Sequence, residues 1–206
     1  MIESMPADRD VTAFAQRALH YDAGWLGRLH HDIVERTVEV LPFSQSRPRR
    51  VLDVGCGTGY LLQVLASRHP EAQELAGVDP AKPMIEMARA SAHDPRIAFA
   101  VGSAEHLPYP DHQFDLVVST TSFDHWTDQR TGAAECARVL ASNGQLIIAD
   151  LFSPWLAPTL VGSRKDKSRT KTRASDLLAG VGLRVVAWHK LVPPINAVVA
   201  VPSATT

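Results

Sequence analysis

A glycine-rich loop near residue 55 lies between a short apolar run and a helical run, and few folds accommodate such a loop. Gly55, Gly57 and Gly59 follow the strand-like residues 50–54 and precede the helix-like residues 60–68. Glycine adopts positive φ readily and lets a ligand approach the backbone closely. The order strand, glycine loop, helix therefore indicates a nucleotide site in an α/β fold.

The spacing of the loop distinguishes between nucleotide ligands. A dinucleotide-binding loop reads G-x-G-x-x-G, whereas the glycines here read G-x-G-x-G and Tyr60 holds the last position. The Gly-Lys-Ser/Thr ending of a P-loop is absent. Asp53 precedes the loop, where a carboxylate suits an amino group better than a pyrophosphate, and Asp79 ends the next strand, where an acid reaches a ribose diol. The pattern predicts an aminoacyl nucleoside without phosphate.

Strands and helices alternate along most of the chain. Seven apolar runs are predicted as strands: 50–54, 74–79, 96–101, 114–119, 145–150, 184–188 and 197–201. Helices are predicted over 14–41, 60–68, 82–92, 132–140 (stopped near Asn143-Gly144) and 174–179. The link 190–196 is too short for a crossover helix, so the last two strands should be antiparallel. We expect an α/β fold, a Rossmann-like, doubly wound, mostly parallel seven-stranded sheet with an antiparallel last strand and helices on both faces.

Composition narrows the class of protein. The 206 residues suit a single domain spanning 1–206, and a content of 45% hydrophobic residues supplies a core. The formal net charge of −1 argues against a general nucleic-acid or membrane-surface binder. The apolar runs are too short to cross a bilayer, and the N-terminus lacks the pattern of a secretory signal. Two cysteines make no disulfide framework, so a cytoplasmic protein is expected.

Further segments extend the glycine-loop pattern. They are Gly77-Val78-Asp79, residues 102–110, the apolar run 114–119 and Ser122-Phe123-Asp124-His125-Trp126. Together they resemble class I S-adenosylmethionine-dependent methyltransferases, in the branch that includes ubiquinone/menaquinone and small-molecule methyltransferases. The resemblance covers roughly residues 21–201. It implies S-adenosylmethionine as cofactor and a small-molecule acceptor methylated on O, N or C.

The resemblance also implies roles for individual residues. Asp53 would orient the amino group of the cofactor, Asp79 would bind its ribose, and Pro80 and Met84 would pack near the adenine. The cofactor would be contacted by Tyr21, Asp53, Gly55, Cys56, Gly57, Gly59, Asp79, Pro80, Met84, Ser103, Ala104, Glu105 and Thr120. An N-terminal helical cap within 1–49 would cover it, and 151–173 would be a substrate-side loop insertion.

Two positions depart from the family pattern. Ser103 stands where Asp is common, and Asp124 stands where His is common. His125 is the best candidate for a general base, because an imidazole accepts a proton near neutral pH, and Asp124 beside it is a second catalytic candidate. The alternative is that His125 and Trp126 only pack the loop over the cofactor. His30 or His31 could face the substrate, or both could lie on an exposed helix face.

Two other functions compete with small-molecule methylation. An RNA methyltransferase could use the basic loop 164–173, although the net charge and the absence of an Asn-Pro-Pro-Tyr/Phe-like motif after residue 119 oppose it. A non-catalytic cofactor-binding partner subunit is the second alternative. No metal site is expected, because no close His/Cys pair has ligand spacing. The acceptor, the methylated atom and the oligomeric state stay open.

Overall fold

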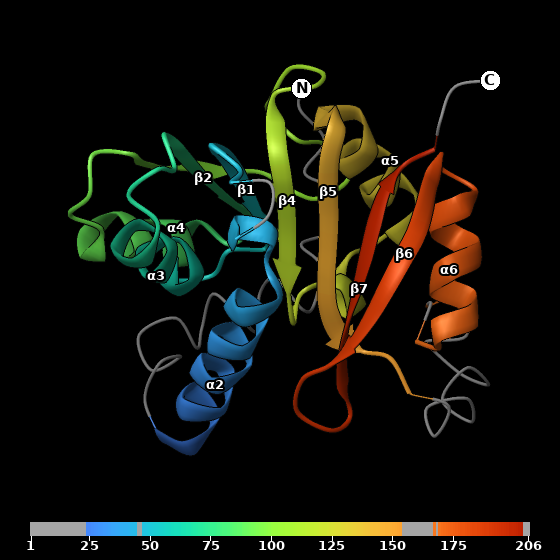
Figure 1. The fold of residues 1–206 in the computed structure, drawn as a ribbon. Helices are drawn as coiled ribbons and strands as arrows, with labels where there is room; N and C mark the ends of the chain where they lie inside the picture. The colour runs from blue at the N-terminus through green and yellow to red at the C-terminus, as the bar shows by residue number, and fades with distance from the viewer. Residues whose placement is uncertain (1–23, 45–46, 154–166, 168, 204–206) are drawn as a thin grey trace, which may run out of the picture.

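The computed structural model describes residues 24–44, 47–153, 167 and 169–203, which form a sheet with helices around it (Figure 1). The strands are β1 (Arg50–Val54), β2 (Glu74–Asp79), β3 (Ile97–Val101), β4 (Phe114–Thr120), β5 (Leu140–Leu151), β6 (Leu183–Lys190) and β7 (Ile195–Pro202). The helices are α2 (Gly24–Val40), α3 (Tyr60–Arg68), α4 (Lys82–Ser91), α5 (Gln129–Val139) and α6 (Lys171–Ala179), with the 3₁₀ turns η2 (Pro42–Ser44) and η3 (Phe123–His125).

The strand order fixes where a ligand can bind. The sheet runs β3-β2-β1-β4-β5-β7-β6, with parallel pairing from β3 through β5 and antiparallel pairing of β7 with both of its neighbours. The expected seven-stranded sheet with an antiparallel last strand is therefore confirmed. The order of the strands reverses at β1 and β4, because β2 and β3 lie on one side of β1 whereas β4 and the later strands lie on the other. Open α/β sheets bind ligands beyond the carboxyl ends of the strands at such a point.

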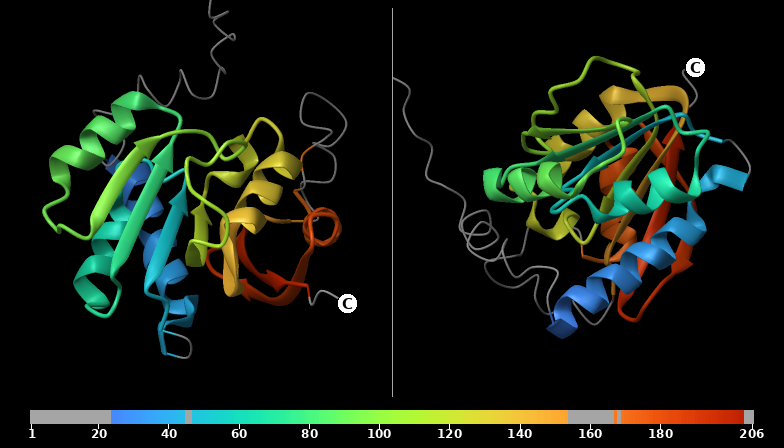
Figure 2. Two further views of the ribbon diagram at one scale, coloured as in Figure 1. Left: turned by 90° about the horizontal axis from the view of Figure 1, so that it is seen from above. Right: turned by 90° about the vertical axis from the view of Figure 1, so that its left-hand side faces the viewer.

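Successive side chains of each strand point to opposite faces of the sheet and pack into two separate hydrophobic cores. Leu52 and Val117 pack on one face with residues of α5 and α6, whereas Val51 and Val118 pack on the other face with residues of α2 and α3. Figures 1 and 2 show helices on both sides of the sheet, as expected. Within the described ranges, no helix is long and apolar enough to cross a bilayer.

Three predicted starts differ from the described ones by three residues or more, each for a local reason. Helix α5 begins at Gln129 rather than at residue 132, because the Asp128 carboxylate caps it by accepting from two backbone N–H groups. Strand β5 begins at residue 140, so Asn143-Gly144 lies within a strand and does not end a helix. Helix α6 begins at Lys171, capped by the Thr170 hydroxyl. Part of the predicted basic loop is consequently helical.

Candidate active site

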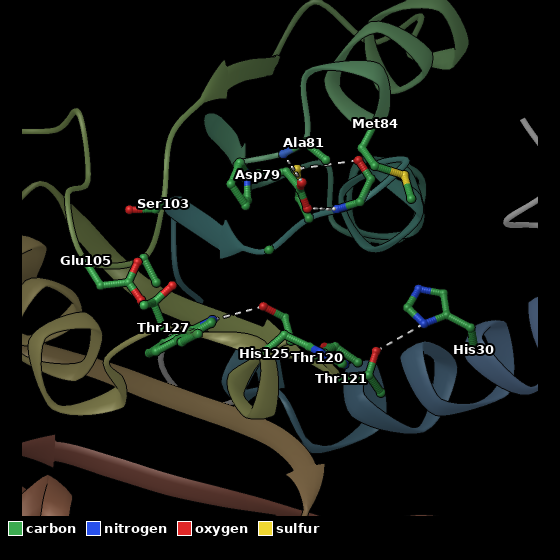
Figure 3. Close-up of a pocket in the computed structure, with 17 residues that line it drawn as sticks. His30, Asp79, Ala81, Met84, Ser103, Glu105, Thr120, Thr121, His125 and Thr127 are labelled. Atoms are coloured by element: carbon green, nitrogen blue, oxygen red, sulfur yellow. Dashed lines mark hydrogen bonds between the residues drawn. The ribbon is translucent and has the colours of Figure 1, made fainter. Parts of the chain in front are cut away.

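A pocket enclosing about 810 Å³, its open mouth included, lies beyond the carboxyl ends of β1, β2 and β4 (Figure 3). Its walls come from the glycine loop, the start of α4, the turn after β3, the end of β4, η3 and α2. The lining residues are His30, Gly55, Cys56, Gly57, Asp79, Pro80, Ala81, Met84, Ser103, Ala104, Glu105, Thr120, Thr121, Ser122, His125, Trp126 and Thr127.

Most residues singled out in the sequence meet at this pocket. The lining contains Gly55, Cys56, Gly57, Asp79, Pro80, Met84, Ser103, Ala104, Glu105, Thr120 and His125. It does not include Asp53, Gly59 or Asp124, and Tyr21 lies outside the described residues. Sequence reasoning missed Ala81 and Thr127, which are small neighbours of the motif residues and carry no signal of their own.

The glycine loop has a shape that does not suit phosphate. Its three glycines have φ of 77°, 52° and 80°. The N–H groups of Gly55 and Cys56 both donate to the Val78 carbonyl, at 2.8 and 3.0 Å, and the Gly57 N–H donates to the Asp79 carboxylate at 3.0 Å. Phosphate sites at such loops depend on backbone N–H groups that point at the ligand. Because these three are satisfied within the protein, they are not available to a pyrophosphate.

Two acids lie at the pocket, Asp79 in its wall and Asp53 behind the glycine loop. Asp79 accepts from the N–H groups of Gly57 and Ala81, and each oxygen keeps a lone pair for a ligand hydroxyl. Burial raises the pKa of Asp79. Asp53 lies behind the loop, only 3% exposed, and burial together with Asp79 raises its pKa to about 8. Among the described lining residues there is no Lys or Arg, so the electrostatics favour a cationic ligand.

The end of β4 carries polar groups directed at the pocket. Thr121 adopts a positive φ of 54°, which is uncommon for a β-branched residue, and its hydroxyl lies 3.3 Å from Nδ1 of His30 on α2 (Figure 3). The buried Thr120 hydroxyl has no hydrogen-bond partner in the described part of the protein. His31 instead stacks on the Tyr60 ring, with centroids 3.8 Å apart. Of the two adjacent histidines, His30 is therefore the one at the pocket.

The turn η3 supplies the remaining wall. Trp126 donates from its indole nitrogen to the Ser122 hydroxyl at 3.0 Å, and both residues line the pocket. His125 lines it as well, as expected for a candidate base. Asp124 does not: its carboxylate binds the Arg169 guanidinium, with Nε 2.5 Å from Oδ1. Asp124 is next to His125 in the sequence, but the structure places its carboxylate in a largely shielded ion pair outside the pocket lining.

Comparison with known proteins finds a family model that matches part of this chain. Residues 52–148, which run from β1 into β5, match the methyltransferase domain family. They contain the glycine loop and every residue of the pocket lining except His30.

Curated relatives of the methyltransferase domain have diverse acceptors in their names. Malonyl-[acyl-carrier protein] O-methyltransferase of Geobacter sulfurreducens is 40% identical over 66% of this chain and 51% of its own length. Demethylmenaquinone methyltransferase of Thermotoga maritima is 34% identical over 65% of this chain and 52% of its own. The chain spans about half the length of the curated relatives it matches.

Solved structures share the fold over nearly the whole chain. A chain from the complex between the Haloferax volcanii Trm112 methyltransferase activator and a methyltransferase superposes with a TM-score of 0.79 at 19% identity, covering 98% of this chain and 99% of that one. A SAM-dependent methyltransferase from Aquifex aeolicus gives 0.69 at 19% identity, covering 90% and 97%. Fold and family together indicate S-adenosylmethionine as the cofactor.

Proposed function

We propose that this chain transfers a methyl group from S-adenosylmethionine to a small-molecule acceptor. The observation that carries the proposal is the pocket at the β1/β4 reversal, which has acids in and behind its wall and loop N–H groups already satisfied. A cationic, phosphate-free nucleoside is the ligand that such a site favours, and S-adenosylmethionine carries both a sulfonium and an ammonium group.

The lining fits the parts of this cofactor. Asp79 retains acceptor capacity for ribose hydroxyls, and Pro80, Ala81 and Met84 offer apolar surface for a base. Ser103, in place of the common Asp, would leave much of the polar recognition of adenine to neighbouring backbone and to Glu105. Asp53 is buried behind the glycine loop and does not line the pocket, so we assign it no direct contact with the ammonium group in this conformation.

The protein itself contributes by aligning the acceptor with the methyl group, excluding water and removing a proton. When bound, the cofactor supplies a methyl group already activated by the sulfonium. Thr120 and Thr121 form the wall where an acceptor would meet that group. An acceptor with an O–H or N–H must also lose a proton, and we propose that His125, which lines the same space, accepts it.

We also propose that the protein works in the cytoplasm. The reducing conditions there suit the free, buried thiols of Cys56 and Cys136.

The structure gives less support to RNA as the acceptor. That hypothesis relied on the basic stretch 164–173, but three of its described cations are engaged within the protein. Arg169 binds Asp124, Lys167 donates to the Trp126 carbonyl, and the Lys171 ammonium lies 5.0 Å from the centroid of the Trp188 ring. Cations engaged in this way add little to a phosphate-binding surface.

Turnover with a panel of acceptors tests the proposal. The chain is incubated with methyl-labelled S-adenosylmethionine and with phenols, amines, quinols and short-chain carboxylic acids, and S-adenosylhomocysteine is quantified. We expect acceptor-dependent product with at least one class and, for D79A, at least a roughly tenfold loss, because the ribose partner is gone. Cofactor binding without product across the panel would favour the non-catalytic subunit, and salt-sensitive RNA binding with RNA methylation would favour the RNA enzyme.

A further inference from the structure

A group of contacts joins η3, in the pocket wall, to the short stretch that leads into α6. Arg169 donates from Nε and Nη2 to the two carboxylate oxygens of Asp124. The Lys167 ammonium donates to the Trp126 carbonyl, and the Ser153 N–H donates to the Arg169 carbonyl at 3.0 Å. Two parts of the chain that lie 45 residues apart are thus held together by side-chain and backbone bonds.

The ion pair between these parts is largely shielded from water. The Asp124 and Arg169 side chains are 8% and 11% exposed. A second buried carboxylate, that of Asp150 at the end of β5, accepts from the Asp124 N–H at 3.1 Å. Two acids therefore lie close together, and the guanidinium of Arg169 compensates their charge. The bidentate geometry adds orientation to attraction, since a planar fork binds a carboxylate in one arrangement.

The other end of η3 reaches the ligand pocket. His125 and Trp126 line it directly. Trp126 also donates to the Ser122 hydroxyl, and Ser122 is packed so tightly on the glycine loop that a Cβ at Gly55 would lie 2.5 Å from its own. A shift of η3 would therefore move a wall of the pocket and disturb the contact that supports the glycine loop.

We propose that Arg169 is a positioning residue of the methyl-transfer site. Through Asp124 it fixes η3, and η3 in turn holds His125 and Trp126 in the pocket wall. The inference rests on the proposed function, because it concerns the same pocket. It also gives Asp124 a supporting role in place of direct catalysis: the carboxylate at this position serves as the anchor for the guanidinium.

Removing the guanidinium should displace the turn. A buried carboxylate that loses its partner is strongly unfavourable, and here a second carboxylate lies beside it. Moving η3 outward to hydrate Asp124 relieves that penalty and takes His125 and Trp126 away from the ligand. If Asp124 is also made neutral, the reason for the movement disappears. The two substitutions should therefore be non-additive in ligand affinity.

The test is a double-mutant cycle read by binding rather than turnover. Wild type, R169M, D124N and D124N/R169M are titrated calorimetrically with S-adenosylhomocysteine, well below their melting temperatures. We expect R169M to lose affinity by about tenfold or more and the double variant to bind at least about threefold more tightly than R169M. R184M, which removes an exposed arginine of β6, serves as the control and should bind like wild type.

A positional readout accompanies the titration. The ring resonances of His125, assigned with H125Q, should shift in R169M and return toward wild type on addition of guanidinium chloride at millimolar concentration, with sodium chloride as control. If R169M does not fold, R169K serves instead, since it keeps the charge and loses the fork. Wild-type affinity and unshifted His125 resonances in a destabilised R169 variant would overturn the inference alone. Failure of wild type to bind would overturn the proposed function as well.

Discussion

Gly55 and Gly57 lie two residues apart in the same loop, yet a methyl group would meet different surroundings at each. Both have positive φ, of 77° and 52°. A Cβ at Gly55 would lie 1.9 Å from the Ser122 hydroxyl oxygen and 2.5 Å from the Ser122 Cβ, whereas a Cβ at Gly57 would have no atom within 4 Å. Rotation of the Ser122 hydroxyl would relieve the first clash but not the second.

The expected free energies of unfolding follow from these distances. An L-residue in the left-handed region costs roughly 1–2 kcal/mol at either position, offset by roughly 0.4–1 kcal/mol because alanine restricts the unfolded chain. At Gly55 the overpacking adds roughly 1–3 kcal/mol. We therefore expect G57A to destabilise by about 1 kcal/mol and G55A by about 2–4 kcal/mol. With a urea slope of about 2 kcal/mol per molar, the two midpoints should differ by about 1 M.

The measurement pairs urea unfolding with titration of S-adenosylhomocysteine. G57A should stay close to wild type in midpoint but lose affinity by at least about tenfold, because Gly57 lines the pocket and the added methyl group would stand in space that no protein atom fills. G55A should unfold early. S122G removes the acceptor of the Trp126 indole, so G55A is also compared on that background, where it should lower the midpoint by much less than it does in wild type because the clash is gone. Equal midpoint shifts in G55A and G57A, or the same shift for G55A with and without S122G, would refute the reasoning.

Four further predictions concern single side chains. Asp53 has a pKa of about 8 against an ordinary 3.8, so the folded chain holds more protons than the unfolded chain between these values and stability falls as pH rises through that window. The stability of D53N relative to wild type should therefore increase from about pH 5 to about pH 8 in urea titrations, by at most roughly 1.4 kcal/mol per pH unit, and a constant difference would contradict the shift. D128A should lose about 1 kcal/mol by urea unfolding because α5 loses its cap, with D128N close to wild type. T120V should keep wild-type stability, since its hydroxyl has no partner in the described structure, but weaken binding of S-adenosylhomocysteine or the acceptor. H125Q should reduce turnover by more than about tenfold at saturating cofactor; near-normal turnover would exclude a base role.

The sequence predicted the bounds of helices and strands best where Gly or Pro flanks an apolar run. The bounds of β1, α3 and β2 were predicted to the residue, because Gly and Pro bracket apolar runs whose period is unambiguous. The start of α5 was missed because Gln129-Arg130-Thr131 carries no apolar residue, and only the Asp128 cap marks it. The start of β5 was hidden because residues 141–144 are small or polar. Asp79 was predicted from its spacing after the glycine loop, and Met84 and Ser103 from the family resemblance; all three line one pocket.

Contacts between segments that lie far apart in the sequence could not be predicted from the residue pattern. Nothing in the order of residues pairs Asp124 with Arg169, so a carboxylate beside His125 in sequence was interpreted as part of the chemistry. The choice between His30 and His31 depends on how α2 is rotated against β4, which periodicity alone left open. The satisfaction of the loop N–H groups by Val78 and Asp79 is also a property of the fold.

The ligand preference of the pocket tests the account most directly. Calorimetric titration of the chain with S-adenosylhomocysteine and, separately, with NAD⁺ compares a phosphate-free aminoacyl nucleoside with a dinucleotide. The acids of the pocket, the satisfied loop N–H groups and the lack of Lys or Arg among the described lining residues predict one-to-one binding of S-adenosylhomocysteine, weakened by about tenfold or more in D79A, and no measurable heat with NAD⁺. Binding of NAD⁺ with equal or greater affinity, or no binding of S-adenosylhomocysteine, would contradict it.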